Sequence, residues 1–181
     1  ASAVYTVLML LSSVHLSFQL LCSKFVARNV TLPGKIAVYR HLLRRAWLCA
    51  IGMGTALLCA SSKISEYLNL PTRDYVVMLA VAAVFFIPLG VRRGLMQGMC
   101  DFRHLALNFV LEGVVKLGAA FLFLAWGWGV MGVIAAVVAS VAVAYLSSSP
   151  NHGILTWPRE DFVLPAALGE SLQASLFFAG Q

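Results

Sequence analysis

Charged residues are scarce in this sequence, and acidic residues are the scarcest. Thirteen lysines and arginines and seven aspartates and glutamates make up 11% of its 181 residues, against about 25% in an ordinary soluble domain. Hydrophobic residues make up 61%, and the mean hydropathy is +0.88. This composition excludes a disordered chain, a basic nucleic-acid-binding domain and most soluble enzymes. It predicts an all-α, polytopic transmembrane helix bundle, because only helices satisfy every backbone polar group of such a chain in lipid.

The sequence also lacks the patterns that carry catalysis or metal binding. Its cysteines form no CxxC pair, and its four histidines fall in different segments without ligand spacing. It contains no HExxH motif, no nucleophile elbow and no paired aspartates. The stretch 127–132 matches GxGxxG, but a predicted membrane helix precedes it where a dinucleotide site needs a strand, so we interpret it as a hairpin turn. We therefore expect no catalytic residue, no metal and no cofactor, and we do not expect an enzyme.

Long apolar runs dominate the chain instead. About twenty apolar residues cross a bilayer core. Five complete runs cover 1–22, 46–62, 75–91, 104–126 and 130–146, and a sixth begins at 162 and continues to 181. The chain starts without methionine inside one run and ends inside another, so we expect a piece of a longer protein.

Basic residues are concentrated in two of the segments between these runs. The segment 24–45 holds six of them and no acid, and the segment 92–103 holds three arginines and one aspartate. The positive-inside rule places both segments on the cytoplasmic side. Apolar residues among the basic ones after Pro33 suit a helix that extends into the headgroup layer, although simple anchoring of the topology explains them equally well.

One charged pair stands inside a predicted span. Glu112 and Lys116 are four residues apart with the glutamate first, which favours a helical ion pair. A lone charge at this depth costs about 2.5–3.5 kcal/mol, and pairing lowers that cost. The pair is either a buried strut or a cavity-lining cation, Lys116, held by Glu112 and able to meet an anionic substrate. We favour the second interpretation, since ionisable residues inside membranes usually mark functional sites.

Two further patterns favour helix contacts or a cavity. Ser12, His15, Gln19 and Ser23 share one face of the first predicted helix, which either bonds to neighbouring helices or lines an aqueous path. His15 and Gln19 favour the cavity wall. Glycines recur every fourth residue at 90, 94 and 98, just after Pro88, and indicate either a hinge or close static packing.

Several short motifs follow one another along most of the chain. They are QLLCSKFVAR at 19–28, RGLMQG at 93–98, Phe102 with Leu105 and Ala106, Leu111 with Glu112, KLG at 116–118, WGWG at 126–129 and Gly132. In this order they resemble the polysaccharide and lipid-linked oligosaccharide flippases of the multidrug/oligosaccharidyl-lipid/polysaccharide exporter superfamily, at about helices two to seven. In that family an R-G-x-x-Q-G-like stretch ends one helix on the cytoplasmic side.

The resemblance implies two pseudo-equivalent six-helix lobes around a central cavity that works by alternating access. Residues 1–161 would form five helices of the N-terminal lobe without its first helix, and 162–181 would begin the second lobe. The implied protein is a multi-pass transporter of the inner (cytoplasmic) membrane. Its partners would be membrane lipids and an anionic, pyrophosphate-linked lipid oligosaccharide, and it would bind no nucleic acid.

The same resemblance suggests where the substrate binds. Lys116 stands where the family often has arginine, which keeps the charge but loses the bidentate fork. Arg28 closes the second family helix, and with Arg92, Arg93 and Arg103 it would form a cationic cytoplasmic mouth that attracts phosphates. The expected substrate-binding residues are Lys116, Glu112, Arg28, Gln19, His15, Arg92, Arg93 and Arg103.

Three other functions stay open from the sequence. A multidrug exporter of the same fold would need an acidic cavity for cationic drugs. A membrane-embedded transferase of envelope glycan synthesis would need a catalytic acid or histidine cluster elsewhere. A purely structural membrane subunit is disfavoured by the buried charge pair.

Overall fold

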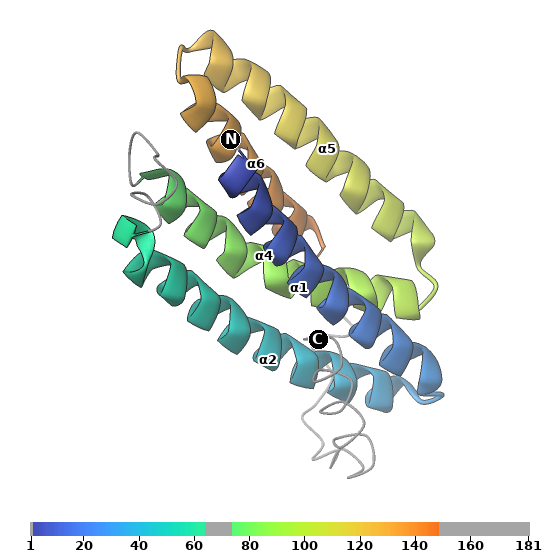
Figure 1. Cartoon of the computed structure of the whole chain (residues 1–181). Helices are drawn as coiled ribbons and strands as arrows, with labels where there is room; N and C mark the ends of the chain where they lie inside the picture. Colours follow the sequence, from blue (N-terminus) through green and yellow to red (C-terminus); the bar gives the residue numbers. More distant parts are fainter. Residues whose placement is uncertain (1, 64–73, 149–181) are drawn as a thin grey trace.

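The chain folds into a bundle of long helices (Figure 1). The computed structural model describes residues 2–63 and 74–148, so the predicted run 162–181 and the segment before it lie outside the described residues. The helices in this part are α1 (Ser2–Arg28), α2 (Leu32–Cys59), α4 (Asp74–Gly98), α5 (Phe102–Ala125) and α6 (Gly129–Ser147). The prediction of an all-helical chain is confirmed for the described residues.

Four of these helices are long and apolar enough to cross a membrane. They are 32–59, 76–98, 102–125 and 129–147. Each overlaps a run predicted as a span. Residues 2–22 of the first predicted run lie in α1, which is not among these four helices. The described part of the chain therefore has the helices of a multi-pass membrane protein.

Two helices extend beyond their predicted ends. α2 begins at Leu32, directly after Thr31, with Pro33 in its first turn. Most of the basic segment 24–45 is therefore helical, with residues 24–28 in α1 and residues 32–45 in α2, which agrees with the helix expected after Pro33. α4 likewise continues to Gly98 rather than ending near 91. An apolar run marks only the uncharged part of a helix, whereas the helix itself continues for as long as its backbone hydrogen bonds do.

Successive helices run up and down through the bundle. Along the contact between α1 and α4 the residue numbers rise together, from His15 beside Gly90 to Val26 beside Gly98, so these helices are parallel. The turns after α1 and α4 therefore lie at one end, and the turn between α5 and α6 lies at the other (Figure 1). The two basic segments contain these two turns, so the structure agrees with the prediction that both segments lie on the same side.

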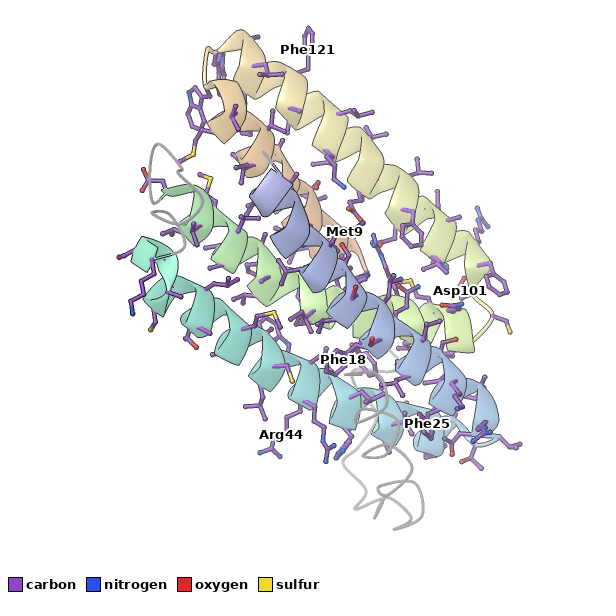
Figure 2. The ribbon with its side chains drawn as sticks, in the orientation of Figure 1. Met9, Phe18, Phe25, Arg44, Asp101 and Phe121 are labelled. Carbon is purple, nitrogen blue, oxygen red and sulfur yellow. The ribbon has the colours of Figure 1, made fainter. Side chains whose placement is uncertain are left out.

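The main core lies between α1, α2 and α4. Phe18 and Phe25 of α1 pack against Leu42 of α2 and Ile87 of α4, and all four side chains are buried. Figure 2 shows these two phenylalanines inside the bundle and Phe121 of α5 pointing away from it. α5 buries little of its surface, so most of its apolar side chains are available to lipid.

A seam of glycines brings α1 and α4 into backbone contact. A Cβ atom built at Gly90 would lie 2.5 Å from the carbonyl oxygen of His15, and one at Gly94 would lie 2.4 Å from that of Gln19. At Gly98 it would meet Val26 at 2.7 Å. The three glycines thus serve close packing, the second of the two predicted alternatives.

The turn between α4 and α5 contains a strained residue. Cys100 has φ 59°, a left-handed conformation that costs a residue with a Cβ atom about 1–2 kcal/mol. The backbone N–H of Asp101 donates to Met96 O at 2.9 Å, which closes the end of α4. Glycine is the residue that this geometry favours.

Replacing Cys100 with glycine is expected to stabilise the protein by about 1 kcal/mol, because glycine adopts the positive φ freely. Thermal unfolding of the full-length protein in detergent measures the change. Cys49→Gly is the matched control, since Cys49 is exposed within α2, and there glycine should lower the melting temperature. A lower melting temperature for C100G would contradict the prediction.

The α5–α6 connection is a tight turn, as interpreted from its glycines. Gly127 and Gly129 have φ 79° and 55°. Phe123 and Trp128 stack with ring centroids 5.1 Å apart. A helix, α5, precedes the GxGxxG match, so the arrangement is not that of a dinucleotide site.

Candidate functional site

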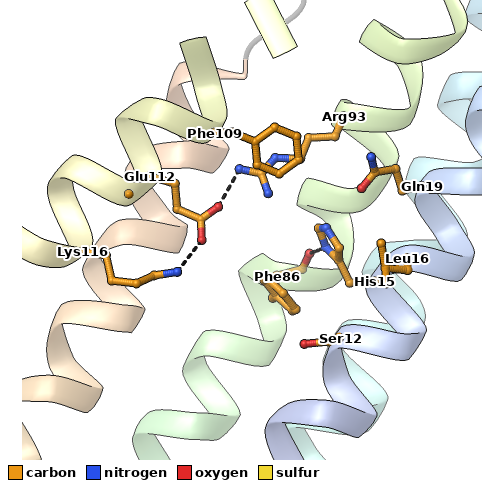
Figure 3. Close-up of a pocket in the computed structure, with 10 residues that line it drawn as sticks. Ser12, His15, Leu16, Gln19, Phe86, Arg93, Phe109, Glu112 and Lys116 are labelled. Atoms are coloured by element: carbon orange, nitrogen blue, oxygen red, sulfur yellow. Dashed lines mark hydrogen bonds and ion pairs between the residues drawn. The ribbon is translucent and has the colours of Figure 1, made fainter. Parts of the chain in front are cut away.

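Polar side chains from α1, α4 and α5 converge on one pocket of about 430 Å³ (Figure 3). The pocket lies within helices predicted to cross the membrane, and charged groups form its centre. Its lining consists of Ser12, His15, Leu16, Gln19, Phe86, Arg93, Phe109, Glu112, Gly113 and Lys116.

The centre is a charged cluster of Arg93, Glu112 and Lys116. Arg93 Nη2 donates to Glu112 Oε2 at 2.6 Å, and Lys116 Nζ donates to Glu112 Oε1 at 2.9 Å. The predicted Glu112–Lys116 pair is therefore present, and Arg93 joins it from α4. Two cations share one carboxylate, so the charged cluster carries a net positive charge.

Arg93 is held rigidly from three sides. Its Nε donates to Asn108 Oδ1 at 2.8 Å, and its guanidinium lies 4.0 Å from the centre of the Phe109 ring. Asn108 Nδ2 in turn donates to Ala144 O of α6 at 2.7 Å and to Ser147 Oγ at 2.9 Å. This network joins α4, α5 and α6 and fixes the position of the guanidinium.

The α1 wall of the pocket is also fixed. His15 Nδ1 donates to Phe86 O at 2.7 Å, and its ring stacks on the Phe86 ring with centroids 4.2 Å apart. Gln19 Nε2 donates to Gln97 Oε1 at 3.2 Å. The polar face predicted on this helix therefore does both things that were considered: it bonds to α4, and Ser12, His15 and Gln19 line the pocket.

The three charged side chains differ in how far water or a ligand can reach them. The Arg93 and Glu112 side chains are 3% and 11% exposed, whereas the Lys116 side chain is 42% exposed. A long, exposed ammonium can change partners, while the buried guanidinium cannot. Lys116 is thus the accessible cation of the charged cluster.

Five of the eight expected substrate-binding residues line this pocket. They are His15, Gln19, Arg93, Glu112 and Lys116. Arg28 and Arg103 are exposed at the end of the bundle where both basic turns lie. They do not reach the pocket.

The expected cationic mouth needs correction, because two of its arginines lie within α4. Arg93 is buried in the pocket. Arg92 points to another face of the helix, where its Nη1 donates to Tyr145 O at 2.6 Å and its guanidinium lies 3.7 Å from the centre of the Tyr145 ring. Adjacent residues of a helix point about 100° apart, so Arg92 contacts α6 while Arg93 points into the pocket.

Asn108 is a residue of the candidate site that sequence reasoning missed, since it bonds to Arg93. It stands four residues before Glu112 and eight before Lys116, so the three share one face of α5. That spacing was readable as a polar stripe. The contacts of Arg93 with this stripe could not be read from the sequence, because they require α4 to remain helical beyond residue 91.

Among the residues that the structure describes, no three histidine, cysteine, aspartate or glutamate side chains come close enough to hold a metal ion.

The chain matches no protein-family model, no curated protein and no solved structure.

Proposed function

We propose that this chain is part of a multi-pass transporter that moves an anionic lipid-linked oligosaccharide or polysaccharide precursor across the cytoplasmic membrane by alternating access. The observation that carries the proposal is the net positive charged cluster, set in a pocket among apolar helices. Maintaining buried charges at such a depth is expensive, and ionisable residues there generally mark the path of a substrate or ion.

The sign of the charge favours an anion. An anionic group can approach Lys116, whose side chain is 42% exposed, and bring the charged cluster closer to neutrality. A cationic drug would instead meet two like charges, because the carboxylate of Glu112 is already shared by Arg93 and Lys116. The pocket therefore supports the flippase proposal over a multidrug exporter.

The walls of the pocket favour an amphipathic substrate. Leu16 of α1 and Phe109 of α5 are exposed apolar side chains beside the charged cluster. An anion joined to a hydrocarbon chain can place its phosphate at Lys116 and its chain against these residues and the surrounding lipid. The glycan part of the proposal comes from the family resemblance.

Lys116→Ala and Lys116→Glu test this function. In cells that depend on the full-length protein, the appearance of labelled lipid-linked glycan on the outer leaflet should fall about tenfold or more for the alanine variant, a loss of roughly 1.4 kcal/mol in transition-state stabilisation. The glutamate variant should fall further, because it repels the phosphate. Lys24→Ala is the matched control, since Lys24 is exposed near the end of α1.

Membrane abundance is measured for each variant so that only transport is compared. If both Lys116 variants move glycan at the wild-type rate, the proposed function is wrong. If instead they leave glycan unchanged and alter resistance to cationic drugs, the multidrug exporter replaces it.

A further inference from the structure

One carboxylate in the pocket holds two cations at once. Glu112 uses Oε2 for Arg93, at 2.6 Å, and Oε1 for Lys116, at 2.9 Å. A phosphate oxyanion makes the same kind of bridge, with separate oxygens accepting from an arginine and a lysine. Glu112 therefore already occupies part of the place that an anionic substrate needs.

The two cations are held very differently. Arg93 has Asn108 and Phe109 as further partners, and Asn108 is itself bonded to the backbone of α6. Lys116 is bonded to Glu112, on its own helix, and its side chain is the most exposed of the three. A change of partner is therefore easier for Lys116 than for Arg93.

We propose that Glu112 is an internal competitor of the substrate: an incoming phosphate or diphosphate group takes Lys116 from Glu112, while Glu112 stays bound to Arg93. The inference rests on the proposed function and adds to it a mechanism by which the empty pocket is kept closed to weak anions. Lys116 is the substrate-contacting residue, and Glu112 acts through it as a positioning residue.

The exchange leaves each charged group with a partner of opposite charge in both states. Without substrate, the carboxylate partly neutralises Arg93 and Lys116. With substrate, the Arg93–Glu112 pair is a complete ion pair, 2.6 Å long and largely shielded from water. Lys116 is then free to pair with the phosphate in the open part of the pocket. No buried charge is left without a partner at either stage, which is the condition for a stable ionic site at this depth.

The neighbouring polar residues do not replace either group in this exchange. His15 Nδ1 is committed to Phe86 O, and the Gln19 amide is bonded to Gln97. They lie on the opposite wall of the pocket, on α1, whereas Glu112 and Lys116 are one helical turn apart on α5 (Figure 3). Competition between Glu112 and the anion for Lys116 is therefore local to α5.

Binding of geranyl diphosphate to the full-length protein in phosphatidylcholine nanodiscs tests the inference. Glu112→Gln should bind the probe about tenfold more tightly than wild type, since it removes one negative charge in contact with the cation. The glutamine can still accept the Arg93 N–H, which limits disruption of the fold. Lys116→Ala should bind more weakly. Most of the gain from E112Q should disappear when it is combined with K116A.

The outcomes separate the inference from the proposed function. An equal gain from E112Q with and without Lys116 would show that Glu112 acts by its charge alone, and would overturn the exchange. Unchanged or weaker binding by E112Q, with K116A still weakened, would overturn it too but leave the anionic pocket standing. If no variant binds the probe, both fall. Equal affinities for inorganic pyrophosphate and geranyl diphosphate would support a phosphate site but count against a lipid-linked substrate.

A measurement on the wild-type protein guards against a variant that fails to fold. With ¹⁵N-labelled lysine and ¹³C-labelled glutamate, solid-state NMR reports whether Lys116 Nζ remains beside the Glu112 carboxylate. The K116A spectrum identifies the lysine signal. The probe should break this contact and create a contact between Nζ and its phosphorus. A Lys116–Glu112 contact that persists at saturating probe would overturn the inference.

Discussion

Replacing Arg93 with methionine is expected to cost about 3–5 kcal/mol of stability, the range for removing one partner of a buried ion pair. The guanidinium donates to Asn108 and Glu112 at 2.8 and 2.6 Å. Methionine fills similar space but donates nothing. Glu112 would keep only Lys116, and the Asn108 oxygen would lose its donor among buried residues. The loss should also loosen the contact between α4 and α5, which Arg93 bridges.

Equilibrium unfolding of the full-length protein in mixed micelles measures this loss. Arg103→Met is the matched control, because Arg103 is exposed at the start of α5, and it should change stability by less than about 0.5 kcal/mol. The double variant R93M/E112M should recover much of the loss, since it leaves no unpaired carboxylate. A stability for R93M within error of wild type would show that the buried pair contributes nothing.

Gly94→Ala is expected to cost about 3 kcal/mol, the upper end of the range for overpacking a tight interior. The new Cβ would lie 2.4 Å from the carbonyl oxygen of Gln19 and 2.7 Å from Cys22 Cβ. Because the first of these atoms is backbone, no side-chain rotation relieves the contact, and α1 must move away from α4. Since α1 carries His15 and Gln19, we also expect weaker anion binding in the pocket.

Gly118→Ala is the control for this substitution. A Cβ at Gly118, in the middle of α5, would meet nothing within 4 Å. There the same change should stabilise the protein by about 0.5–1 kcal/mol, because alanine favours the helix over glycine. Both variants are compared by the thermal unfolding midpoint. Equal shifts for the two would contradict the assignment of the glycine seam to close packing.

Where the long apolar helices of the described residues lie was largely readable from the sequence, for a simple physical reason. Lipid requires long uninterrupted apolar helices, and each leaves a run that composition reveals. The helix ends were not readable in this way. Lys35 and Arg93 lie outside the apolar runs but inside helices, because backbone hydrogen bonding does not depend on whether a side chain is apolar or charged.

The part of the pocket that the sequence predicted consists of residues on one face of a single helix. The Glu112–Lys116 pair and the stripe through His15 and Gln19 are local patterns, since the fixed geometry of one helix places such residues on one face. The contact of Arg93 with Glu112 is a contact between helices, and it depends on their relative rotation and distance. Local spacing carries no information about these, so Arg93 was expected at a cytoplasmic mouth and is found in the pocket.

Positions in the glycine seam restrict the residue type far more than positions on the outer face of α5. At Gly90, Gly94 and Gly98 the partner backbone is so near that any side chain would collide with it, so each position admits a single residue type. On the outer face of α5, by contrast, exposed residues such as Leu117 and Phe121 need only be apolar. The packing of α1 on α4 therefore depends on a few specific positions of α4, whereas the outer face of α5 tolerates many different apolar residues.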